Sequence, residues 1–380
     1  MSIETGGEIR TEEFLLNMGP QHPSTHGVFR IVVRTDGELV IDLECHMGYL
    51  HRCFEKCAEG NQYIAVVPYT DRMDYLAAMS NNLAFSVAVE KLAGIEVSEK
   101  AKWLRMITVE LQRIASHLMA VGTYGLDVGA ITAFLHCFRE RERLLEIFEI
   151  MSGQRLNYSY IVPGGVLYEW PDDMPKRIER FCDFFEARLR EYNDLLTNNG
   201  IFIARTANVG VLPAELAISY GCTGPVLRGS GIKRDLRKDR PYENYDQVEF
   251  DVPVGRGTMG ALGDCWDRYY VRVQEMAESV KIIRQCLDRY ATATGAVAMQ
   301  AKKQLRPKKG ADAYGVCENP RGELGYYVIS DGNPIPYRVK ARAPSFCNVS
   351  VLEEISRGCM VADLIVILGS IDIVLGEVDR

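Results

Sequence analysis

Four long stretches in the middle of the chain repeat apolar residues at every third or fourth position. In the first stretch the repeating residues are Leu104, Ile107, Leu111, Ile114 and Leu118. The other stripes are Phe134, Phe138, Leu145 and Phe148; Ile178, Phe181, Phe185, Leu189, Tyr192 and Leu196; and Tyr269, Val273, Met276, Val280, Ile283 and Leu287. Because a helix turns once in about 3.6 residues, each stripe predicts a long helix with one buried face. Together they predict helices packed lengthwise as a bundle, with the stripes as core.

Strand patterns flank this helical region. Val28–Thr35 and Glu38–Cys45 are rich in β-branched or alternating residues and are joined by Asp36-Gly37, a turn signal, which predicts a β-hairpin. A second hairpin is expected from Gly325–Ser330 and Pro336–Arg342.

These patterns predict an α+β fold in three parts. Residues 1–79 are expected to form a β-rich domain, 80–292 a helical bundle with inserted loops, and 293–380 a crossover and a C-terminal α+β region. The crossover, Ala293–Gly310, is basic without an apolar face and is expected at the surface. The last residues, SIDIVLGEVDR, mix apolar and charged side chains, which indicates a docked terminus.

The composition fits a soluble globular protein, with 47% hydrophobic and 25% charged residues. A formal net charge of −7 gives no indication of binding to nucleic acid or to an anionic membrane. Eleven cysteines without compact disulfide spacing are typical of a reducing compartment. The N-terminus lacks a secretory signal and the run Val361–Leu368 is too short to span a bilayer, so membrane attachment is expected only through a partner.

The segment Asn17–Gly27 carries the most unusual residue types. Its two prolines exclude a helix interior, so His22 and His26 are not the paired ligands of a helical zinc protease. One interpretation is an ordered loop that offers an imidazole to a ligand. The other, about equally consistent with the residue types, is a tight turn whose histidines bond to nearby backbone.

Several single residues have both a structural and a functional interpretation. Asp74 is expected to cap an apolar helix over Leu76–Leu92, and Tyr75 beside it is most simply a core aromatic. Asp127 is either a cap or turn residue or a carboxylate that tunes a basic side chain. The alternating Arg139–Arg143 is expected on an outer helix face.

Two further segments give weak signals. Cys53 and Cys57, with His46 and His51 nearby, make a metal site conceivable, but no second cysteine pair follows at a suitable spacing. Gly221–Tyr242 lacks the spacing of a phosphate-binding loop and is expected to be a structured loop with a basic rim.

Ten motifs in order give the chain a resemblance over nearly its whole length. They are GPQHPSTHGVFR, HMGYLHRCFEK, PYTDRMDYL, ELQRIASHL, FRERE, PGGV, SGIKRDLRK, RGELGYYVISDG, PYRVKARAPSF and GEVDR. The chain resembles the NuoD-type subunit of respiratory complex I, the proton-pumping NADH:quinone oxidoreductase. That family is related to the large subunit of nickel–iron hydrogenases, so a hydrogenase-like α+β fold is implied.

The hydrogenase relationship is testable in the sequence. A hydrogenase large subunit holds its metals with two C-x-x-C pairs. Here Asp74 and Ala77 stand at the first pair, and Val374 and Glu377 stand at the second. Without soft thiolates a nickel–iron centre has no ligands, so no metal is expected.

The resemblance also assigns roles to individual residues. It implies that His26 and Tyr75 donate protons to a quinone, and that Asp127 is the acid partner of His26. His22 and Thr25 would belong to the quinone loop. Arg52 and Arg72 would face an iron–sulfur cluster in the partner subunit.

The family assembles with other proteins, and the chain is expected to be inactive alone because it binds no cofactor itself. The implied partners are a NuoB-type iron–sulfur subunit, NuoC-type and NuoI-type subunits, and a NuoH-type membrane subunit, at the cytoplasmic face of the inner membrane. Asn157 stands where the family commonly has a histidine, and the crossover at 293–310 is shorter than usual. These departures point to a trimmed arm and leave the electron donor open.

Three functions are therefore weighed. The first is electron transfer to a membrane quinone within complex I. The second is a scaffold in a related ferredoxin- or F420-dependent complex, or in a relative of the membrane-bound hydrogenases. The third is a metallohydrolase built on the N-terminal histidines.

Overall fold

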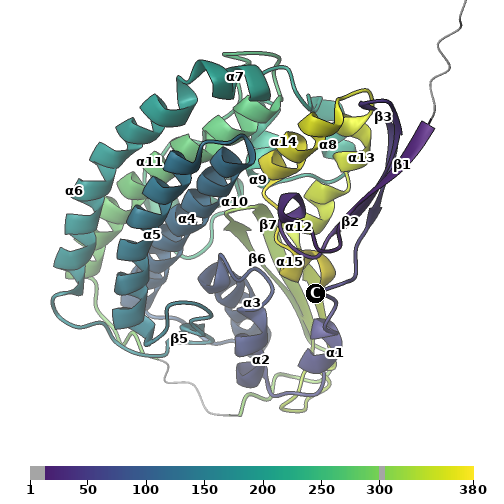
Figure 1. Cartoon of the computed structure of the whole chain (residues 1–380). Helices are drawn as coiled ribbons and strands as arrows, with labels where there is room; N and C mark the ends of the chain where they lie inside the picture. The colour runs from purple at the N-terminus through teal and green to yellow at the C-terminus, as the bar shows by residue number, and fades with distance from the viewer. Residues whose placement is uncertain (1–12, 299–303) are drawn as a thin grey trace, which may run out of the picture.

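The computed structural model describes residues 13–298 and 304–380, and its largest element is a bundle of long helices. The bundle contains α4 (Glu99–Asp127), α5 (Ile131–Ser152), α6 (Met174–Tyr192) and α11 (Cys265–Thr292), which lie side by side in Figure 1. α4 packs against both α5 and α11. The four predicted helices are thus confirmed.

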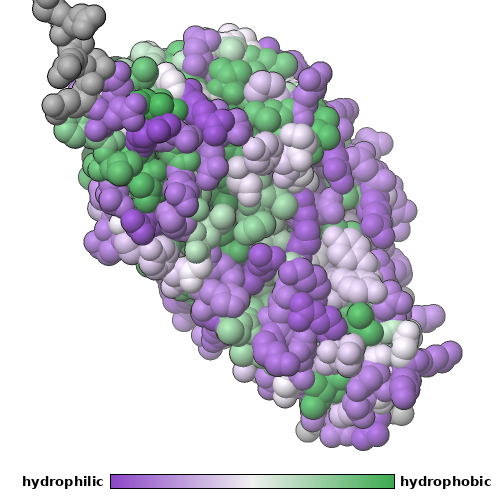
Figure 2. All heavy atoms as spheres, turned by 90° about the vertical axis from the view of Figure 1, so that its right-hand side faces the viewer, coloured by the Kyte–Doolittle hydropathy of each residue, from purple (hydrophilic) through white to green (hydrophobic). Residues whose placement is uncertain are grey.

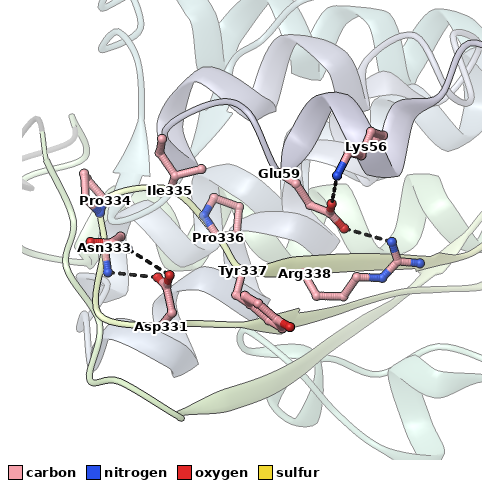
Figure 3. A pocket seen from close by; sticks show the side chains of 9 residues that line it. All are labelled: Lys56, Glu59, Asp331, Asn333, Pro334, Ile335, Pro336, Tyr337 and Arg338. Atoms are coloured by element: carbon pink, nitrogen blue, oxygen red, sulfur yellow. Dashed lines mark hydrogen bonds and ion pairs between the residues drawn. The ribbon is translucent and has the colours of Figure 1, made fainter.

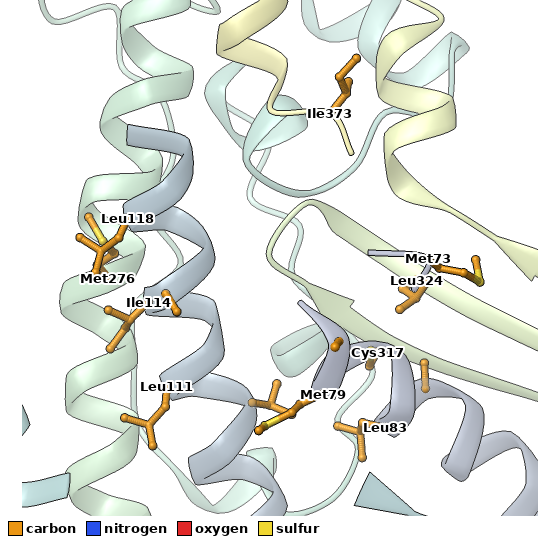
Figure 4. Close-up of a cluster of buried hydrophobic side chains, with 14 of the residues drawn as sticks. Met73, Met79, Leu83, Leu111, Ile114, Leu118, Met276, Cys317, Leu324 and Ile373 are labelled. Atoms are coloured by element: carbon orange, nitrogen blue, oxygen red, sulfur yellow. The ribbon is translucent and has the colours of Figure 1, made fainter. Parts of the chain in front are cut away.

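The apolar stripe of α4 forms the centre of the core. Leu111, Ile114 and Leu118 are fully buried, and Figure 4 shows them directed toward α11, from which Met276 points back. α4 begins at a Ser98 cap, whose hydroxyl accepts a hydrogen bond from the backbone N–H of Ala101 at 3.1 Å. This buried face fixes the position of Asp127 at the other end of the helix.

A three-stranded antiparallel sheet forms the N-terminal part. The predicted hairpin is confirmed as β2 (Arg30–Asp36) and β3 (Leu39–His46). β1 (Glu13–Met18), which the sequence pattern did not predict, pairs with β2 on the other side. In Figure 1 these strands lie at the right-hand edge of the molecule, away from the bundle.

The second sheet contains β6 (Asp312–Asn319), β7 (Gly322–Ile329) and β8 (Arg338–Arg342). β7 and β8 confirm the second predicted hairpin, and β6 is an addition. α3 (Ala78–Ala93) packs on β6 and β7. The approach is close, because a Cβ at Gly315 would lie 2.3 Å from the backbone nitrogen of Ala88.

Short elements complete the chain. They are α1 (Phe54–Ala58), α2 (Tyr63–Thr70), β4 (Ile161–Val162), β5 (Gly165–Val166), α7 (Gly200–Thr206), α8 (Ala214–Ser219), α9 (Gly224–Gly229), α10 (Leu236–Asp239), α12 (Pro344–Val349), α13 (Leu352–Ser356), α14 (Val361–Ile371) and α15 (Leu375–Asp379). Every residue of α15 is buried, which confirms the docked terminus.

The prediction for Asp74 was wrong, and those for the outer face of α5 and for the basic rim each failed at one buried residue, whereas Arg139, Arg143 and Lys233 are exposed there. Asp74 is not a helix cap: α3 begins at Ala78, and the Asp74 carboxylate is buried. Glu140, within the supposed outer face of α5, is buried and accepts a hydrogen bond from the Tyr192 hydroxyl at 2.9 Å. Arg237, expected on a basic rim, is buried against Glu110 at 3.0 Å. The part of the predicted crossover over 299–303 lies outside the described residues.

Candidate functional site

The loop between β1 and β2 presents His26. Its 3-10 turn, Pro23–Thr25, is closed by the His22 ring, whose Nδ1 accepts a hydrogen bond from the Ser24 backbone N–H at 3.2 Å. The buried Thr25 hydroxyl lies 2.8 Å from the His22 carbonyl oxygen. His22 and Thr25 therefore stabilise the loop itself, as in the tight-turn interpretation. His26 follows in the left-handed region, with φ 54°.

His26 contacts an acid from the far end of the bundle. Its Nε2 lies 2.8 Å from Oδ2 of Asp127, the last residue of α4. Burial alone would lower the pKa of His26, but the hydrogen bond and negative charge of Asp127 outweigh it and raise the pKa above its usual value. The pair therefore favours an imidazolium close to neutral pH.

A cavity of about 250 Å³ opens beside this pair. It is lined by Pro23, His26, Tyr75, Leu76, Met119, Thr123, Leu126, Asp127, Asp372, Ile373 and Val374. Most of these side chains are apolar, and His26, Tyr75 and Asp127 converge on the space they enclose. A mostly apolar pocket with a few polar groups is the usual form of a site for a flat organic ligand.

Tyr75 reaches the cavity from the segment between α2 and α3. Burial raises the pKa of its phenol; Arg321 and Arg52 oppose the rise, and Asp74 and Asp372 reinforce it. The phenol is therefore protonated at neutral pH, and Tyr75 can act as a hydrogen-bond donor to a ligand.

A cluster of buried charged side chains lies behind the cavity. Arg321, fully buried between β6 and β7, donates from Nη1 to Asp74 Oδ2 at 2.9 Å and from Nη2 to Asp372 Oδ1 at 3.1 Å. In the sequence, the only indication of this cluster was that Asp74 and Glu377 stand where hydrogenases have metal-binding cysteines. Arg321 itself stands in a motif, RGELGYY, that gave no indication of its burial.

Arg52 and Arg72 lie together outside the cavity. A guanidinium nitrogen of Arg52 donates to the Arg72 carbonyl oxygen at 2.5 Å, and Arg72 donates to the Pro68 carbonyl oxygen at 2.6 Å. Both side chains are exposed. Asn157, at the position of the family histidine, is half-buried with φ 58°.

A second cavity, of about 670 Å³, lies between α1 and the turn after β7 (Figure 3). Three of its four charged side chains are paired with one another: Glu59 contacts Lys56 at 3.0 Å and Arg338 at 2.8 Å, while Asp331 bonds to Asn333. None of the predicted site residues lines it. We therefore take the cavity at His26 as the candidate functional site.

Within residues 13–298 and 304–380, no group of three or more His, Cys, Asp and Glu side chains is arranged to hold a metal ion. In the same residues no helix is long and apolar enough to cross a membrane. The face that carries β1 shows small apolar clusters among polar side chains (Figure 2), and the exposed apolar residues of this strand are Phe14, Leu15 and Leu16.

The sequence is similar to proteins of one family. A family model described as the 49 Kd subunit of respiratory-chain NADH dehydrogenase matches residues 127–313 and 303–380. The NuoD-type subunit of the NADH-quinone oxidoreductase of Chlorobaculum tepidum is 51% identical over 375 residues, covering 98% of this chain and 94% of the relative. That of Chlorobium luteolum is also 51% identical, covering 98% and 95%. A NuoD-type subunit of Cytophaga hutchinsonii is 50% identical over 382 residues, covering 98% and 97%.

Proposed function

The chain belongs to the family of the 49-kDa, NuoD-type subunit of respiratory-chain NADH dehydrogenase and is a subunit of an NADH-quinone oxidoreductase, and from this premise we propose that its cavity at His26 is where quinone is reduced and protonated. The observation that carries the proposal is the convergence of His26, Tyr75 and Asp127 on one apolar cavity. These residues come from three separate parts of the chain.

Quinone chemistry needs this combination of groups. A quinone is a flat ring with two carbonyl oxygens, and both become strongly basic after two electrons arrive. Each oxygen then needs a proton from a positioned acid. The apolar walls suit the ring, and two proton donors suit its two oxygens.

His26 is the first proposed donor. As an imidazolium held by Asp127 at 2.8 Å it gives a proton from the ring to one quinone oxygen. Because Asp127 stabilises the cation, it keeps His26 charged until the quinone oxygen becomes the stronger base.

Tyr75 is the second proposed donor. Its phenol lines the same cavity and makes no hydrogen bond within the part of the chain that the structure describes, so its O–H is free to reach a ligand. Transfer of that proton to the other quinone oxygen leaves a phenolate that must be protonated again.

Partner subunits are the proposed source of the electrons. We propose that a NuoB-type subunit places its iron–sulfur cluster against Arg52 and Arg72 and supplies the electrons. The exposure and adjacency of these two arginines support a contact there. NuoC-type, NuoI-type and NuoH-type subunits complete the assembly, with the chain peripheral at the cytoplasmic face of the inner membrane.

The test compares two variants in the assembled complex. His26→Ala and Tyr75→Phe each remove one proton donor, and we expect quinone turnover to fall about 10²-fold or more for each, the size of a lost general acid. His46→Ala, on the half-exposed end of β3, is the matched control and is expected to keep full turnover. Assembled variants with unchanged turnover would support the scaffold function instead.

A further inference from the structure

The charged group behind the cavity contains more acids than bases. Arg321 binds Asp74 and Asp372, and Glu377 of α15 is a third fully buried carboxyl that also lies within the field of Arg321. The second nearby cation, Arg272, stays 3.8 Å from Asp372. Three buried carboxyl groups therefore share essentially one close guanidinium.

Glu377 has only half of its hydrogen-bonding capacity filled. Its Oε1 accepts hydrogen bonds from the Ser345 backbone N–H at 3.0 Å and from the Ser345 hydroxyl. Its Oε2 is buried and has no partner in the part of the chain that the structure describes. An ionised carboxylate oxygen would be expensive to bury in this way, whereas a carboxylic acid with its proton on Oε2 is not charged.

The electrostatics of the group agree with this geometry. Burial and the negative charge of Asp74 raise the pKa of Glu377 to about 8, although Arg321 and Ser345 act in the opposite direction. The charged and titratable groups that interact with Glu377 from the elements around it are Asp74, Arg321, Cys317 and Tyr326. The carboxyl group is therefore predominantly neutral at pH 7.

Glu377 also belongs to the segment packed against the Tyr75 region. A Cβ at Gly376 would lie 2.4 Å from the Met73 carbonyl oxygen, so α15 contacts the residues just before Tyr75. Asp74 is the neighbour of Tyr75 in the chain and influences the pKa of both Tyr75 and Glu377. The negative charge of Asp74 therefore acts on both the phenol and the buried acid.

We propose that Glu377 stores a proton for the quinone site and restores the Tyr75 phenol after that phenol has protonated the reduced quinone. The inference rests on the proposed function and adds a positioning residue to it. Glu377 loses the proton on Oε2, the Tyr75 phenolate gains one on its oxygen, and Glu377 takes a replacement from water once the product has left. The two electrons come from the iron–sulfur partner and do not pass through Glu377.

The direction of the transfer is downhill. Burial raises the pKa of Tyr75 above its usual value of about 10, so its phenolate is a stronger base than the carboxylate of Glu377. An acid inside the protein avoids opening the cavity to water while the reduced quinone is still bound.

The experiment uses the assembled complex with Glu377→Gln. Glutamine keeps the shape of the side chain and an oxygen for Ser345 but has no proton to release. We expect kcat to fall about 10²-fold, the lower end for a lost proton transfer, with KM for quinone unchanged. The infrared difference spectrum of reduced minus oxidised complex should also lose a carboxylic C=O band. Glu353→Gln, whose carboxylate accepts the Cys45 backbone N–H at 3.0 Å, is the matched control and should change neither.

A second variant tests the proposal if the complex with Glu377→Gln does not assemble. Ser345→Ala removes the hydroxyl that stabilises ionised Glu377, so the pKa of Glu377 should rise and the alkaline decline of kcat should move to higher pH. Assembled Glu377→Gln with normal kcat and an unchanged spectrum would overturn the proposal, and so would Ser345→Ala with an unshifted profile. If the His26 and Tyr75 variants lose turnover while Glu377→Gln keeps it and Ser345→Ala leaves the pH profile unshifted, only the proton store fails. If the His26 and Tyr75 variants also keep turnover, the proposed function fails as well.

Discussion

The variant Asp127→Asn isolates the electrostatic part of the His26–Asp127 pair. Asparagine has the same shape and keeps an oxygen that can accept the His26 ring N–H, so the loop geometry should survive. What disappears is the negative charge 2.8 Å from Nε2. Because Asp127 contributes more than Asp372 to raising the pKa of His26 against the effect of burial, the pKa should fall in the variant.

The magnitude follows from the environment of the pair. The His26 and Asp127 side chains are only 17% and 12% exposed, so solvent screens them weakly. A hydrogen bond to a charged group contributes about 1.5–3 kcal/mol, and each 1.36 kcal/mol added to an activation barrier slows a reaction about tenfold. We therefore expect kcat for quinone reduction to fall about 10- to 100-fold, with KM little changed.

The assay is quinone turnover of the assembled complex as a function of pH. Lowering the pH restores imidazolium in the variant, so the deficit should shrink as the pH falls toward and below about 6.5, the ordinary pKa of histidine. Asp42→Asn is the control, since Asp42 also pairs with a cation, Arg357, at 3.1 Å but on the surface. A deficit that is the same at every pH, or a complex that no longer assembles, would show that Asp127 has a structural role and refute this reasoning.

Two further predictions concern the core and the partner. Ile114→Ala should lower the free energy of unfolding by about 2–5 kcal/mol in thermal or denaturant unfolding, because Ile114 is fully buried between α4 and α11; Leu135→Ala, at a residue 59% exposed, should change it little. Arg52→Gln should lower the midpoint potential of the partner's cluster in a redox titration of the complex, because a nearby cation favours the reduced form. The control, Arg357→Gln, should leave that potential unchanged. An unchanged potential in Arg52→Gln would mean that the cluster does not lie beside Arg52.

The sequence predicted the elements whose side-chain periodicity is simple. The α4 and α11 stripes and the β2–β3 and β7–β8 hairpins appear where their patterns placed them. β1 was not predicted because nearly all of its residues are exposed and its sequence shows no alternation of apolar and polar residues. β6 was not predicted because its second half is buried on both faces, which likewise removes the alternation of apolar and polar residues.

The site was predictable only in part. His26 and Asp127 each stood out alone, by their unusual residue type in a loop or an apolar link, but nothing in their spacing of 101 positions indicated a contact. The buried charges were the least predictable. A single Arg or Glu in a sequence is most simply a surface residue, so Arg321, Glu140 and Arg237 gave no signal of burial.

The buried charges suit the proton chemistry that we propose for a pocket without metal ligands. Once Arg321 is buried, Asp74 and Asp372 are needed to pair with it, since removing one partner of a buried ion pair costs about 3–5 kcal/mol. With that cation satisfied, a further carboxyl at position 377 has no close counter-charge and is most stable with its proton attached. In this proposal the protein holds protons in two chemically different forms around one cavity. His26 holds one as a cation stabilised by the carboxylate of Asp127. Glu377 holds the other as a neutral acid, because no close cation stabilises its ionised form. Negative charge nearby raises the pKa of both groups, so each keeps its proton to a higher pH than a free imidazole or carboxyl group would.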